Sequence, residues 1–138
     1  MVLMSLFGHF CAYSQNSVTG KWKTIDDDTN KAKSIVEISE HKGVLNGKII
    51  KLFREPGEDP DPVCDKCDPD DIRHNKKIIG MEIIRDLKKD NSEYSGGTIL
   101  DPADGKVYRC KIWLNGNNLM VRGYWGPFYR TQIWKREN

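Results

Sequence analysis

Short runs of alternating apolar and polar residues fill the chain from residue 19 onward, and each run ends at a turn signal. A period of two is typical of a strand that buries one face, and no long window carries the apolar stripe of a helix. The sequence predicts eight strands, at 19–25, 32–40, 44–53, 78–87, 93–100, 106–114, 118–125 and 128–136. Between them lie the turn-forming segments DDDTN, HKG, KKDNS, DPADG, NGN and GP, and one long loop, 54–77.

Two of the later strands show which side chains share a face. The more apolar face of 106–114 carries Tyr108, Cys110, Ile112 and Leu114, and that of 118–125 carries Leu119, Val121, Gly123 and Trp125. Eight consecutive strands with mostly tight turns predict an all-β, up-and-down antiparallel meander, and closing it into a single barrel removes both exposed edges. The interior of such a barrel is filled by side chains or holds one small ligand. A two-sheet sandwich fits the same pattern.

Length and charge narrow the class of protein. A chain of 138 residues is long enough for one domain with its own core. Its formal net charge is only +2, so no overall field favours nucleic acid or a membrane surface. The charge is uneven, because eight acidic residues lie between Glu55 and Asp71 against Lys66 alone.

The first residues predict export. Residues 2–13, VLMSLFGHFCAY, form an almost uncharged apolar run that is too short for a membrane span and has the length of a signal-peptide core. Ala12 and Ser14 are the small residues expected before a cleavage site, so we expect 1–14 to be a signal peptide and 15–138 an exported domain that is not an integral membrane protein. A buried N-terminal strand is the alternative. Because no Lys or Arg precedes the run, a start further upstream stays open.

Cys64 and Cys67 stand in the acidic loop, in the sequence D-P-V-C-D-K-C-D-P-D-D. Neighbouring aspartates disfavour the thiolate that redox catalysis needs. A zinc site usually needs four ligands, and apart from carboxylates only His74 and Cys110 could join the pair. The acidic residues suit calcium, but their spacing does not follow the known calcium loop. We therefore expect a Cys64–Cys67 disulfide and no metal, with Cys110 a buried free thiol; a bond from Cys110 to one of the pair is the alternative.

No catalytic constellation is present. G-x-S-x-G, phosphate-loop and dinucleotide fingerprints are absent, and neither His41 nor His74 has a nucleophile at a recognisable motif spacing. Aromatic residues and arginines instead concentrate in the second half of the chain, as an apolar pocket with a few polar groups would require. For a bound ligand we expect Arg122, Tyr124 and Arg130 to supply polar contacts, beside Tyr108 and Trp125.

Several segments resemble known families. Gly20-Lys21-Trp22 matches the G-x-W that opens lipocalin barrels, where an arginine at the position of Arg136 packs on the tryptophan. The segments G-G-T-I-L-D-P, G-K-V-Y-R-C-K, L-M-V-R-G-Y-W-G and R-T-Q-I-W-K-R, together with C-D-K-C and I-I-G-M, resemble the DUF2147 family. That resemblance implies a small exported bacterial protein with a lipocalin-like barrel and no assigned biochemical role.

These observations together predict a non-enzymatic periplasmic or secreted protein without a cofactor, which binds a small apolar or amphipathic ligand in its barrel. Export and the acidic loop argue against nucleic acid as a partner. The alternative is an envelope interaction module whose barrel is filled and whose outer face or acidic loop meets a protein partner.

Overall fold

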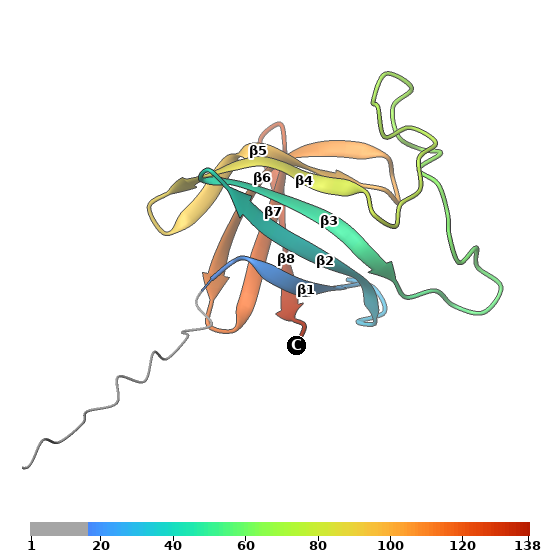
Figure 1. Ribbon diagram of the computed structural model, residues 1–138, viewed down its shortest axis with the longest axis horizontal. Helices are drawn as coiled ribbons and strands as arrows, with labels where there is room; N and C mark the ends of the chain where they lie inside the picture. Colours follow the sequence, from blue (N-terminus) through green and yellow to red (C-terminus); the bar gives the residue numbers. More distant parts are fainter. Residues whose placement is uncertain (1–16) are drawn as a thin grey trace, which may run out of the picture.

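A computed structural model of the protein describes residues 17–138 and shows a closed barrel of eight antiparallel strands (Figure 1). Each strand pairs with the next in the chain, and β1 pairs with β8. The strands are β1 (Gly20–Ile25), β2 (Ala32–His41), β3 (Val44–Leu52), β4 (Glu82–Asp90), β5 (Glu93–Asp101), β6 (Lys106–Asn115), β7 (Asn118–Trp125) and β8 (Phe128–Arg136). The predicted up-and-down barrel is confirmed. The expected signal peptide, residues 1–14, lies outside the described residues.

Seven of the eight predicted strands lie within two residues of their observed bounds, and the fourth does not. The sequence predicts it at 78–87, whereas β4 spans Glu82–Asp90. Ile78 and Met81 are buried, but they belong to a turn at Gly80, whose φ is 93°. In that turn Met81 N donates to Ile78 O, at 3.1 Å. The apolar run therefore marks a loop that packs into the core rather than the start of a strand.

The two ends of the barrel differ in their connections. The β2–β3, β4–β5 and β6–β7 turns lie at one end together with the start of β1, and this is called the closed end below. The connections 26–31, 53–81, 102–105 and 126–127 lie at the other, called the open end. No described residue belongs to a helix capable of crossing a membrane.

Apolar side chains fill the barrel from the closed end to its middle. Opposed residues on neighbouring strands share a face, so the pairs Trp22–Val36, Leu45–Leu87, Ile112–Val121 and Leu119–Trp134 all point inward. These eight side chains are at most 3% exposed. Burying a side chain of this size stabilises the fold by about 1.5–3 kcal/mol, so this half of the barrel holds most of the core.

Trp22 and Arg136 join the two ends of the chain. The Arg136 guanidinium lies 4.0 Å from the centre of the Trp22 indole and donates to Ser17 O at 2.7 Å. Trp22 Nε1 donates to Val18 O at 2.8 Å. Gly20 has a φ of 120°, and a Cβ there would lie 3.3 Å from Arg136 Nη1. The glycine of the G-x-W motif therefore supplies both the backbone angle and the room that the arginine needs.

The long β3–β4 loop is attached to the outside of the barrel. Its disulfide segment packs against the β5–β6 turn, since a Cβ on Gly105 would lie 1.8 Å from Lys66 O. Arg73 forms a two-point ion pair with Asp71 at 2.9 and 2.8 Å and donates to Glu82 O at 3.0 Å. The acidic residues therefore stand on an ordered segment that is fixed to β4 and to the β5–β6 turn.

Candidate functional site

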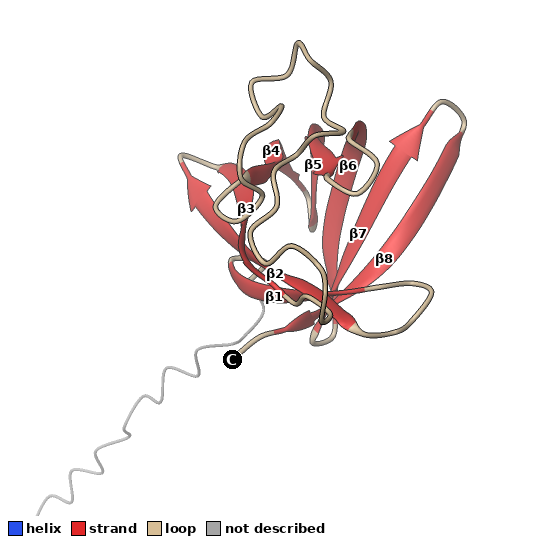
Figure 2. Ribbon diagram, turned by 90° about the vertical axis from the view of Figure 1, so that its right-hand side faces the viewer, coloured by secondary structure: helices blue, strands red, loops and turns tan. Residues whose placement is uncertain are grey.

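The inner face of the barrel changes character at the open end. Tyr108 pairs with Ile99, Gly123 with Arg130, and Trp125 with Phe128, which places these side chains on the same face as the core. Together with Asp27 from the β1–β2 turn, Tyr108, Trp125, Phe128 and Arg130 are called the mouth cluster below. Figure 2 shows the β7–β8 hairpin leaning away from β1 and β2 at this end. The inner face of the hairpin stays partly open to solvent at this end, because Trp125 and Phe128 are exposed.

The aromatic members of the mouth cluster form a row. The ring centres of Tyr108 and Trp125 lie 5.9 Å apart at an interplanar angle of 68°, and those of Trp125 and Phe128 lie 6.2 Å apart at 31°. Such offset and edge contacts are the favourable arrangements for aromatic rings. Trp125 is 46% exposed and Phe128 is 62% exposed, although both face the inside of the barrel. Apolar rings that face inward yet stay in water are suited to contact a small molecule.

Arg130 supplies the positive charge of the mouth cluster and Asp27 the negative charge. Arg130 donates to Asp27 Oδ2, and Gln132 Nε2 donates to the same oxygen at 3.2 Å. The Arg130 side chain is 60% exposed and that of Asp27 37%, so this ion pair contributes little to folding stability. It joins the β1–β2 turn to β8 where the two strands have separated, since β1 pairs with β8 only at Trp22 and Lys23.

Tyr108 is held in place by Asp104. Its hydroxyl donates to Asp104 Oδ2 at 2.5 Å, across the β5–β6 turn. Burial, together with this bond to a carboxylate, raises the pKa of Tyr108 to about 12. The phenol is therefore neutral at physiological pH and its ring is fixed beside Trp125. Deeper in the barrel, the buried Thr24 and Ser34 hydroxyls lie 2.7 Å apart and satisfy each other.

The residues expected to contact a ligand divide between two faces of the sheet. Tyr108, Trp125 and Arg130 lie together on the inner face, but Arg122 and Tyr124 lie on the outer face. The Arg122 guanidinium stacks between two outer rings, 4.9 Å from that of Trp113 and 4.3 Å from that of Tyr129, and donates to Thr131 Oγ1 at 2.7 Å. Arg109 lies 5.6 Å from the Tyr124 ring. The expectation that Arg122 and Tyr124 line the barrel therefore needs correction, because strand alternation turns them away from the inner face.

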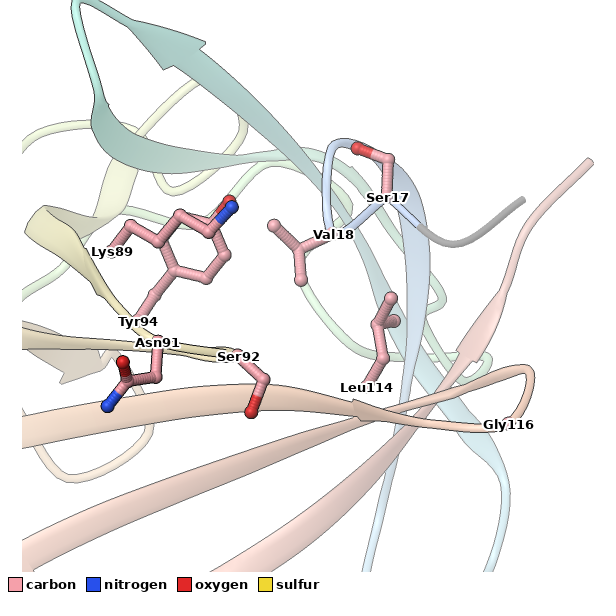
Figure 3. A pocket seen from close by; sticks show the side chains of 8 residues that line it. All are labelled: Ser17, Val18, Lys89, Asn91, Ser92, Tyr94, Leu114 and Gly116. Carbon is pink, nitrogen blue, oxygen red and sulfur yellow. The ribbon is translucent and has the colours of Figure 1, made fainter. Parts of the chain in front are cut away.

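Two open hollows lie apart from the aromatic row of the mouth cluster, and the smaller one borders the cluster at Asp27. The larger, about 670 Å³, is at the closed end, where Val18 and Leu114 face Tyr94 and Lys89 (Figure 3). Burial and the nearby Glu40 carboxylate raise the pKa of Tyr94. The smaller, about 330 Å³, lies where β1 and β8 separate, and its lining residues are Ile25, Asp26, Asp27, Asn30, Thr131, Ile133 and Lys135. Neither was anticipated from the sequence, because each is lined by segments distant in the chain.

The cysteines pair as expected. Cys64 and Cys67 form a disulfide with Cα atoms 5.4 Å apart, and Cys110 is a buried free thiol. Burial raises the pKa of Cys110 to about 12, which leaves this thiol protonated and unreactive. Within residues 17–138, no three His, Cys, Asp or Glu side chains come together as a metal site would require.

Asp27 and Phe128 are the members of the mouth cluster that sequence analysis did not single out as ligand contacts. Phe128 pairs with Trp125 across the β7–β8 hairpin. Paired residues share a face, so a hairpin at this position places Phe128 on the same face as Trp125. Asp27 carried no such signal, because it belongs to a turn of three consecutive aspartates and lies 103 residues from Arg130. Only the closed barrel brings these two together.

Comparison with known proteins agrees with this architecture. The model of an uncharacterised protein family conserved in bacteria, DUF2147, matches residues 20–136. The chain belongs to the DUF2147 family. Among solved structures it is similar to the protein HP1028 from Helicobacter pylori, described as a member of the lipocalin family, with 26% sequence identity and a TM-score of 0.73. The match covers 88% of this chain and 84% of HP1028. A comparison with curated proteins finds no match.

Proposed function

We propose that this DUF2147 protein is an exported, non-enzymatic binding protein that holds a small apolar or amphipathic molecule at the open end of its barrel. One observation carries the proposal: Trp125 and Phe128 face inward at the mouth and remain largely exposed. Folding normally removes such inward-facing rings from water, because their burial is favourable. A ligand that covers them would gain the apolar contact that the fold leaves unused.

The filled closed half limits how deep a ligand can reach. Trp22, Trp134 and their neighbours occupy the barrel there, so the proposed ligand lies across the mouth rather than along the axis. Arg130, Asp27 and the Tyr108–Asp104 pair then provide polar contacts at the edge of an aromatic surface. Apolar walls with a few polar groups are the usual composition of small-ligand sites.

Native mass spectrometry of protein isolated from its own periplasm tests this proposal. We expect a retained small mass on the protein, and an N-terminus at Gln15 would support export. The matched binding assay uses the neutral apolar dye N-phenyl-1-naphthylamine. Trp125→Ala should abolish its fluorescence increase, whereas Arg122→Ala, on the outer face, should leave it unchanged. A clean mass and no dye binding by the wild-type protein would refute the proposal.

A second candidate, an envelope interaction module, rests on a different observation. Val107, Tyr129 and Ile133 are exposed apolar residues on the outer face of β6 and β8. We take this outer face as the candidate surface for a protein partner, because large apolar side chains are exposed on it. If the protein elutes in a complex from envelope extracts and Tyr129→Lys releases the partner without changing dye binding, this second function holds instead.

A further inference from the structure

The mouth cluster combines aromatic faces with the Arg130–Asp27 ion pair, and the connections around it at the open end carry an excess of negative charge. Arg130 already has a counter-ion in Asp27, so the local positive charge is matched. Asp104 adds a further carboxylate beside Tyr108. The four connections at the open end contain twelve acidic residues against six basic ones, although the whole chain has a net charge of +2. A ligand that approaches this end therefore meets a negative field.

We propose that the molecule held at the mouth carries a positively charged head group, of the substituted-ammonium class, on an apolar body. This inference rests on the proposed function and specifies its ligand class. The faces of the exposed Trp125 and Phe128 rings attract cations through their negative quadrupole, and tryptophan does so best among aromatic residues. Asp27 is the carboxylate of the mouth cluster, and a cationic head group would share it with Arg130, which costs little because both side chains are exposed and the ion pair is weak.

A ligand with a carboxylate head would meet the opposite conditions. It would have to displace Asp27 from Arg130, and it would lie against aromatic faces and a rim that both repel anions. A neutral head would gain the apolar contact alone. Three ligands that share one alkyl chain and differ only in the head group therefore separate the charge preference from apolar binding.

Isothermal titration calorimetry with decyltrimethylammonium, decanol and decanoate, each below its micellar concentration, is the test. We expect the ammonium compound to bind about fivefold or more tightly than decanol, and decanoate to bind most weakly. Added salt should narrow this difference, because exposed charges are screened over about 8 Å at physiological ionic strength. If decanol or decanoate binds as tightly as the ammonium compound, the inference is wrong while the proposed function stands. If none of the three binds, both are wrong.

Single substitutions test which residues cause the preference for an ammonium head group. Asp27→Asn should weaken ammonium binding severalfold and strengthen decanoate binding, because it leaves Arg130 without its carboxylate partner. Asp28→Asn, an exposed neighbour in the same turn, removes the same unit of charge and should leave the order of the three ligands unchanged. Trp125→Leu keeps an apolar side chain and should reduce the advantage of ammonium over decanol, because one of the two exposed aromatic faces is lost. Equal effects of the two aspartate variants would overturn the assignment to Asp27.

Discussion

Replacing Gly105 with alanine tests how the acidic loop is attached to the barrel. Gly105 lies in the β5–β6 turn with a φ of +74°, and a Cβ there would lie 1.8 Å from Lys66 O and 2.2 Å from the carbonyl carbon of Lys66. No rotamer change relieves this contact, because both neighbours are backbone atoms. The disulfide segment must therefore move away from the turn.

The size of the effect follows from two separate costs. An alanine with positive φ costs about 1 kcal/mol relative to glycine wherever it stands. Gly116 measures this cost alone, since its φ is +61° and a Cβ would meet nothing within 4 Å. Leu100 lies on the outer face at the end of β5 beside this turn and is 1% exposed, so we expect the moved segment to uncover it. Exposing a leucine costs about 1.5–3 kcal/mol, so Gly105→Ala should destabilise the protein by about 2 kcal/mol more than Gly116→Ala.

Urea unfolding of the wild-type protein and both variants gives the comparison. Limited proteolysis provides the second measurement, because a displaced loop should be cut between residues 54 and 77 in Gly105→Ala and stay protected in Gly116→Ala. Equal free energies of unfolding in the two variants, with unchanged cleavage of the loop, would show that the loop does not pack against the β5–β6 turn at Gly105.

Three further predictions concern other contacts. Arg73 lowers the pKa of Asp71 to about 2 through its side-chain hydrogen bonds, so the pair adds about 2 kcal/mol above about pH 4, and this stability is lost as the pH falls toward 2. Asp71→Asn should remove that dependence in urea titrations at several pH values. Replacing Cys64 and Cys67 with serine should lower the free energy of unfolding by about 2 kcal/mol and make the loop more sensitive to protease, while the circular dichroism of the barrel stays unchanged. Thiol counting on denatured wild-type protein that lacks residues 1–14 should find one free thiol. Three free thiols would contradict the disulfide. Arg136→Lys should lower the free energy of unfolding by about 1 kcal/mol in the same urea titration. A lysine cannot stack on the Trp22 ring and also donate to both Thr19 O and Ser17 O, as the guanidinium does. An unchanged free energy of unfolding would argue against the stacking contact.

The strand pattern predicted the fold well because alternation is a local property. Each of the segments 106–114 and 118–125 shows its buried face within eight or nine residues, and the observed faces are those expected. The error at the fourth strand has the same origin. A buried turn such as 78–81 presents apolar residues to the core just as a strand does, and the positive φ of Gly80 and the bond from Met81 N to Ile78 O distinguish it from a strand.

The mouth cluster was harder to predict from the sequence than the strands were. Arg122 and Tyr124 alternate with Leu119 and Val121 along 118–125, but the sequence did not fix which of these two faces points inward, because both carry apolar or aromatic residues. The sequence did not say whether a ligand would use the inner or the outer face. The pairing of Arg130 with Asp27 depends on barrel closure, which brings the first turn beside the last strand.

The separation of the two ends explains why the mouth can leave aromatic rings in water. Stability comes mainly from the closed half, where Trp22 and Trp134 are almost completely buried. The β1–β8 pairing is also confined to that half, at Trp22 and Lys23. Trp125 and Phe128 lie outside the buried core cluster, so replacing them leaves the packing of the closed half intact. Changes in binding caused by substitutions at the mouth should therefore reflect contact with the ligand rather than loss of the fold, so the proposed charge preference at Asp27 can be tested on a folded protein.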